Sequence, residues 1–324
     1  MKSFAIKLVL TLGMVAVILW QVDPSTILNR FIMLSPVTML TCLLMAVVQI
    51  LMLSYRWMLV THVTQLRIPF SELLRCTFAS QFFSQGLPAS VGGDALRIWW
   101  VSRIGAPVLL ATQNVLLDRL SGLFALLMVN LVSLPVVFAL IGGSSLIVSI
   151  MVTVAMAFAA ILVSASRFGR RLTIVVFSIV QRVTGREDWG RGPMHWLLGL
   201  QRAAGKLFLF RQGSVVMFWG LLIHLATIGL CVVIANGAGI PLTPLGALAV
   251  VPGVLLLSYL PISVGGWGVR EGGMALALGL VGVPPSDAVF VGLALGAVGL
   301  IAALLGALVW LVSPMPITLM GRQR

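Results

Sequence analysis

The chain contains a series of apolar stretches, most of them as long as a helix that crosses a bilayer. A helix needs roughly 17–25 apolar residues to cross the hydrocarbon core. Apolar residues make up 60% of the chain and charged residues 9%, whereas soluble domains hold about 45–50% and about 25%. We therefore predict an all-α polytopic membrane protein. The clearest spans are Phe4–Gln21, Val37–Tyr55, Leu120–Ile141, Leu146–Val163, Val215–Ala235 and Val289–Val312.

Two further apolar regions, Leu73–Val101 and Leu245–Leu280, each contain a proline and a glycine pair. Proline removes an intrahelical hydrogen bond and glycine weakens a helix, so we expect a broken helix in each region. Irregular backbone at membrane depth is tolerated only where protein or a water-filled cavity shields it. We expect these regions to enter and leave on the same side, as re-entrant hairpins.

The net charge of +13 comes mainly from basic residues in the connections between apolar spans. Because cytoplasmic loops are rich in Lys and Arg, we predict both termini in the cytoplasm and six full crossings. Eight crossings result if the broken regions span fully. Residues 56–75 would form a second basic cytoplasmic connection, marked by Arg56, Arg67 and Arg75. The charge indicates contact with anionic headgroups, and no nucleic-acid motif occurs.

The long basic connection, residues 164–213, contains two stretches with apolar and basic residues together, Arg170–Arg182 and His195–Arg211. This composition is typical of helices that lie on the membrane surface. The alternative is that they gate a cavity.

One motif occurs twice. Residues 87–97 read LPASVGGDALR and residues 260–270 read LPISVGGWGVR, with seven identities at the same spacing. Each copy lies between two spans. Within a single domain, 1–324, residues 37–141 and 214–312 are thus predicted to be two repeats. The predicted orientation makes them inverted, an arrangement typical of alternating-access carriers.

The repeated motif predicts an anion site. A new half-helix begins after each glycine pair, and its free N–H groups and positive dipole end favour an anion. Serine hydroxyls add donors, and the arginine guanidinium suits phosphate. The predicted substrate-binding residues are Ser90, Gly92, Gly93, Arg97, Ser263, Gly265, Gly266 and Arg270. In the alternative, the motifs only let two hairpins pack, and Asp94 and Glu271 neutralise the arginines.

Four further charged residues are candidates for gating or proton coupling, namely Asp94, Asp118, Arg119 and Glu271. Charge inside a membrane span is costly and therefore tends to be functional, although Asp118 and Arg119 could instead reach the interface. The scattered histidines and cysteines do not have metal-ligand spacing, and we expect neither a metal nor a cofactor. No P-loop is present.

Phe82–Gly105, Leu117–Arg119 and Ser258–Gly273 resemble the lysylphosphatidylglycerol synthase transmembrane family, the flippase-like part of multiple peptide resistance factors. The resemblance implies a protein of the bacterial or archaeal inner membrane that translocates lipids, either aminoacylated phospholipids or polyprenyl-linked, hopanoid or glycolipid compounds. Bifunctional members add a soluble aminoacyltransferase domain, which we do not expect here.

The leading prediction is thus a lipid flippase, with anionic membrane lipids as its partners. It could act alone, as a homodimer or with a separate lipid-synthesising enzyme. One alternative is a membrane-embedded enzyme or enzyme subunit of lipid or envelope biosynthesis, for which Asp94 and Glu271 are the only candidate acid–base pair. Another is a carrier of small organic anions.

Overall fold

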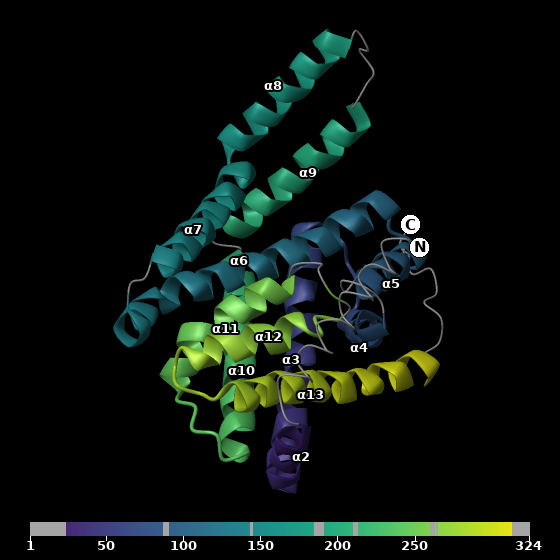
Figure 1. Ribbon diagram of the computed structural model, residues 1–324. Helices are drawn as coiled ribbons and strands as arrows, with labels where there is room; N and C mark the ends of the chain where they lie inside the picture. Colours follow the sequence, from purple (N-terminus) through teal and green to yellow (C-terminus); the bar gives the residue numbers. More distant parts are fainter. Residues whose placement is uncertain are drawn as a thin grey trace.

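A computed structural model describes residues 24–86, 91–142, 145–184, 191–209, 213–259, 263 and 265–312 (Figure 1). Within these residues the chain is entirely helical. The twelve described helices are α2 (Pro24–Met33), α3 (Pro36–Val63), α4 (Phe70–Gly86), α5 (Val91–Arg103), α6 (Val108–Ile141), α7 (Ser145–Ala165), α8 (Arg167–Thr184), α9 (Arg191–Phe208), α10 (Ser214–Gly237), α11 (Pro244–Tyr259), α12 (Val269–Gly279) and α13 (Pro285–Val312).

Four of the described helices, α3, α6, α10 and α13, are long and apolar enough to cross a membrane. They contain four of the predicted spans. The apolar helix α7 contains a fifth, and the predicted span Phe4–Gln21 lies outside the described residues. The protein is therefore a polytopic helical membrane protein.

The predicted connection at residues 56–75 is wrong in its extent. It is confined to residues 64–69, so Arg56 lies inside α3 and Arg75 inside α4. Arg56 is buried and paired with Asp118 of α6, and this pairing lets a charged residue continue the helix. Helix α6 likewise begins at Val108, twelve residues before the predicted span, and places Asp118 and Arg119 within a helix.

Each interrupted apolar region forms two helices. The first gives α4 and α5, and the second gives α11 and α12. Before α12 the backbone turns through Gly265, Gly266 and Gly268, whose φ values are 60°, 79° and 84°. Residues with a side chain rarely adopt such angles, so this turn requires glycine.

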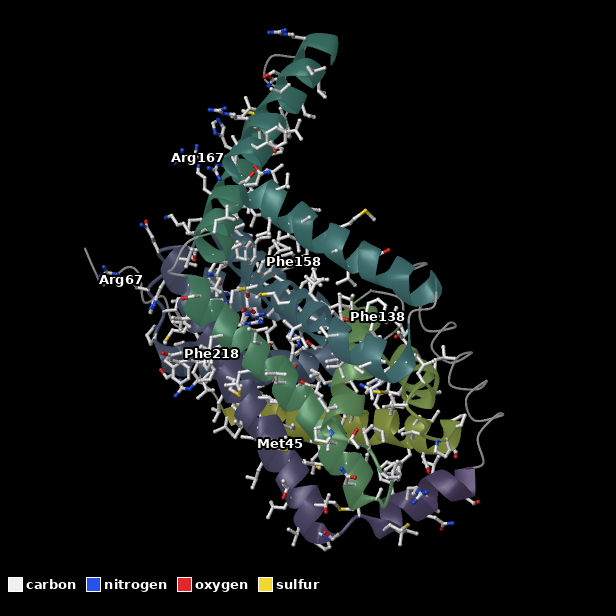
Figure 2. The ribbon with its side chains drawn as sticks, turned by 90° about the vertical axis from the view of Figure 1, so that its left-hand side faces the viewer. Met45, Arg67, Phe138, Phe158, Arg167 and Phe218 are labelled. Carbon is white, nitrogen blue, oxygen red and sulfur yellow. The ribbon has the colours of Figure 1, made fainter. Side chains whose placement is uncertain are left out.

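Helices α3 and α10 lie side by side and run in opposite directions (Figures 1 and 2). Gly237, at the end of α10, lies against Thr38 near the start of α3, and Gly220, near the start of α10, faces Arg56 towards the end of α3.

The remaining helices of the two segments α3–α6 and α10–α13 pack in matched pairs. Helix α4 packs on α13 and α11 packs on α6, while α5 packs on α6 and α12 packs on α13. The first two pairs are antiparallel: Gly299 and Gly306 of α13 lie near Gln85 and Phe78 of α4, and Gly122 and Asn130 of α6 lie near Tyr259 and Pro252 of α11. If the segments α3–α6 and α10–α13 are exchanged in order, the pair α4–α13 becomes α11–α6 and the pair α5–α6 becomes α12–α13.

Helix α7 packs against α6, and α8 and α9 extend from this end of the body (Figure 1). Helix α9 is attached to α6: the Gln113 side chain donates to the Trp196 carbonyl at 2.7 Å, and the Trp196 indole donates to the Leu109 carbonyl at 3.2 Å. Thr173 and Gln201 join α8 to α9. The connection 164–213 is thus a helical hairpin over its described residues.

An ion pair between Arg30 and Asp287 attaches α2 to α13. Arg30 donates two hydrogen bonds of 2.9 Å to Asp287, and a third of 2.9 Å to the carbonyl of Ala238 after α10. The Phe31 and Phe290 rings meet edge to face beside it, 4.9 Å apart. Bidentate arginine–carboxylate pairs are stronger than ordinary ion pairs, so this contact fixes α2.

We expect Arg30→Gln and Asp287→Asn to be coupled by about 1–2 kcal/mol in a double-mutant cycle of unfolding free energies, because each removes the other's bidentate partner. The pair Glu72–Arg75, whose arginine side chain is 44% exposed, supplies a matched control with a coupling of about 0–1 kcal/mol. Equal coupling in both cycles would show that Arg30 does not hold α2 in place.

Candidate functional site

A buried carboxylate, Asp118 of α6, holds two arginines from two other helices. Its Oδ1 lies 3.1 Å from Arg56 of α3, and its Oδ2 lies 2.7 Å from Arg97 of α5. All three residues are less than a tenth exposed. Charges this deep persist only when paired, so Asp118 sets the positions of both arginines.

A second, less buried pair continues the cluster. The Arg119 Nε donates to both carboxylate oxygens of Asp94 at 3.0 and 2.9 Å, and Asp94 also lies 3.8 Å from Arg97. The side chains of Arg119 and Asp94 are 36% and 25% exposed. We call Arg56, Asp94, Arg97, Asp118 and Arg119 the charge cluster. Three arginines against two aspartates leave one excess positive charge.

Local sequence explains how these charges meet. Asp94 and Arg97 are three residues apart on α5, so they share a face. Gly122 of α6 leaves room for the Arg56 guanidinium, since a Cβ there would lie 2.7 Å from the Arg56 Nη1. The Arg97 guanidinium stacks 3.9 Å from the centre of the Trp57 ring, and its buried Nε has no hydrogen-bond partner among the residues that the structure describes.

The charge cluster lines a cavity of about 210 Å³ between α3, α4, α5, α6 and α11. Its other lining residues are Leu53, Thr77, Ser80, Gln81, Ser84, Gly93 and Tyr259. Every helix that lines the cavity therefore contributes at least one polar side chain to it, in a body whose outer surface is apolar.

Helix α4 presents four polar side chains to the cavity. Thr77, Ser80, Gln81 and Ser84 recur at helical spacing and so lie on one face. Ser80 and Ser84 donate to carbonyls of their own helix, which leaves their oxygen lone pairs free to accept. Gly93 of α5 packs so closely here that a Cβ would lie 2.6 Å from the Ser80 carbonyl oxygen.

The second motif has different surroundings. Arg270 donates to Glu271 at 2.6 Å and to the Gly292 carbonyl of α13 at 3.0 Å, and it lies 4.8 Å from the Trp267 ring centre. The buried Glu271 also accepts a hydrogen bond from the backbone N–H of Gly268. This pair fixes the start of α12 against α13.

The predicted site residues thus fall into two groups. Gly93, Asp94, Arg97, Asp118 and Arg119 lie together at the cavity, with Gly92 buried beside them, while Ser90 is outside the described residues. Ser263, Gly265, Gly266, Arg270 and Glu271 belong to the second turn and do not line this cavity. The two regions still meet, because a Cβ on Gly265 would lie 3.6 Å from the Gln85 carbonyl oxygen of α4.

The sequence prediction missed Arg56 and Tyr259 as members of the site. Arg56 did carry a signal, because the apolar sequence continues past it through Trp57 to Val60. An arginine within an apolar run indicates a buried partner. Tyr259 gave no such signal, since a tyrosine at the end of an apolar helix fits a membrane interface equally well.

The fold and the cavity define a polytopic helical membrane protein with a charged cavity between α3, α4, α5, α6 and α11. The family model of the lysylphosphatidylglycerol synthase transmembrane region matches residues 4–316. The chain belongs to this family. The search of curated proteins found no match.

Proposed function

We propose that this protein moves lipids with an anionic headgroup between the leaflets of the bacterial cytoplasmic membrane. The observation that carries the proposal is the excess positive charge of the cluster in a cavity among membrane helices. Burying a charged side chain inside a membrane protein costs free energy, and charged residues at this depth tend to line a substrate pathway. Membership of the family supports the same function.

The charges differ in how they would act. Asp118 holds both Arg56 and Arg97 at the buried side, whereas Arg119 and Asp94 are partly exposed. A phosphate oxygen would replace the Asp94 carboxylate on the Arg119 guanidinium, and the Arg97 guanidinium would face the same headgroup. A cavity of about 210 Å³ lies below the roughly 300–1,000 Å³ of pockets for whole small molecules. It suits a headgroup whose acyl chains remain in the bilayer.

Alternating access would come from two inverted repeats, residues 37–141 and 214–312. The antiparallel pairing of α3 with α10 and the matched pairs α4–α13 and α11–α6 support this arrangement. In it α4 with α5 and α11 with α12 are re-entrant hairpins, and both termini are cytoplasmic. Carriers of this kind bind substrate where the repeats meet, and Tyr259 brings the second repeat to the cavity.

Proteoliposomes test the proposal. The protein should move fluorescent phosphatidylglycerol faster than phosphatidylcholine, measured as the fraction of label that an external reductant quenches. Arg119→Gln removes a charge-assisted hydrogen bond of about 1.5–3 kcal/mol, so we expect roughly a tenfold or greater loss of the phosphatidylglycerol rate. Arg119 is suited to this test because its exposed side chain is not part of the buried pairs.

Arg75→Gln is the matched control, since Arg75 lies on α4 outside the cavity and pairs only with Glu72 among the described residues. It should transport as the wild type does. Equal rates for Arg119→Gln, Arg97→Gln and wild type would refute the anion site. Covalent conversion of the lipid by the purified protein would instead support a membrane-embedded enzyme.

A further inference from the structure

Helix α8 has one apolar face that no described part of the chain covers. Phe168, Leu172 and Ile179 are 67%, 51% and 52% exposed, and Val175 and Val176 are exposed beside them. Their spacing of three and four residues places them on one side of the helix. Five exposed apolar side chains on one face need an apolar environment.

The face of α8 directly beside this apolar face is basic. Arg167, Arg171 and Arg182 lie there with Ser178, and α8 contains no acidic residue. None of these three arginines forms an ion pair with any residue that the structure describes. Arg170 differs, because it donates to the Ala165 carbonyl at the end of α7.

The third side of α8 carries its attachment to α9. The Thr173 hydroxyl and the Gln201 amide are hydrogen-bonded, with the Gln201 Nε2 donating at 3.0 Å. Thr173 lies on neither the apolar nor the basic face, so the contact with α9 leaves both faces open.

The position of α8 places it at a membrane surface. It follows the apolar helix α7 after a single residue, Ser166, whose hydroxyl accepts from the Gly169 N–H and starts the new helix. At this junction the chain turns sharply, with Arg167 at the bend (Figure 2). Since α7 is apolar along its length, its end marks the edge of the hydrocarbon.

We propose that α8 lies in the membrane interface, with its apolar face among acyl chains and its arginines on anionic headgroups. An apolar face with a basic face beside it, and no acid on the helix, is complementary to an anionic lipid surface and not to a purely apolar one. Through Thr173 and Gln201, the surface helix would be tied to α9 and so to α6, which carries Asp118 and Arg119.

Spin labels on the full chain test this placement. Leu172→Cys marks the apolar face and Ser178→Cys the basic face, each in a protein whose buried native cysteines are replaced by alanine. In nanodiscs of phosphatidylcholine and phosphatidylglycerol, relaxation by oxygen relative to a water-soluble nickel chelate should be at least severalfold higher at position 172 than at position 178. Omitting phosphatidylglycerol, or replacing Arg167, Arg171 and Arg182 by glutamine, should reduce that ratio.

Three results would overturn the proposal. Equal access of the chelate to both positions would place α8 in water. Protection of position 172 from both relaxants, with spin–spin broadening between copies, would make the apolar face a contact between two chains. A ratio that is independent of phosphatidylglycerol and of the three arginines would rule out recognition of anionic lipid.

Discussion

Asp118→Ala should destabilise the protein by about 3–5 kcal/mol, the expected loss when one partner of a buried ion pair is removed. Asp118 is the shared partner of Arg56 and Arg97, so its loss leaves two buried guanidinium groups without that carboxylate. Repulsion between the two guanidinium groups, and the cost of keeping them out of water, then weaken the packing of α3, α5 and α6. Unfolding in mixed micelles with increasing denaturing detergent measures the change.

Restoring charge balance should recover part of that loss. The double variant Asp118→Asn with Arg97→Gln removes one charge of each sign and should be more stable than Asp118→Asn alone. Arg75→Ala is the control, because the Arg75 side chain is 44% exposed and its ion pair with Glu72 should contribute about 0–1 kcal/mol. If Asp118→Ala costs no more than Arg75→Ala, the charge cluster is hydrated and its pairing does not stabilise the fold.

The helical fold and most helix positions could be predicted from the sequence, because a bilayer requires long apolar helices and the chain contains them. The ends of α3 and α6 could not be predicted in this way. A sequence rule ends a span at a charged residue, and here Arg56 and Asp118 continue the helices because each neutralises the other across the bundle. Long-range pairing of this kind has no local sequence signal.

The candidate site was predicted in part for the same reason. Gly93, Asp94 and Arg97 are marked by the repeated motif, and Asp118 and Arg119 by their apolar surroundings. The repeated motif also predicted that Arg97 and Arg270 bind the same anion, with neutralisation of one of them by a neighbouring acid as the alternative, and Arg270 packs against α13 with its neighbour Glu271 and does not line the cavity. Sequence identity between the repeats does not fix which partner each arginine finds.

The contact between α4 and α13 predicts a second large effect, at a residue with no charge. Gly306 packs against the backbone of α4 so tightly that a Cβ there would overlap the Phe78 carbonyl oxygen. Backbone cannot rotate aside as a side chain can, so Gly306→Ala forces the two helices apart. Overpacking of this kind costs about 1–3 kcal/mol.

The matched control is Gly272→Ala in α12, where a Cβ would meet no atom within 4 Å. That variant should be unchanged or more stable by up to about 1 kcal/mol, because alanine favours the helix more than glycine does. The same unfolding experiment measures both. Since α4 also lines the cavity, Gly306→Ala should slow lipid transport even in the folded fraction. If Gly306→Ala and Gly272→Ala change the unfolding free energy equally, α4 and α13 are not in close contact. The pairing of α4 with α13 would then be wrong.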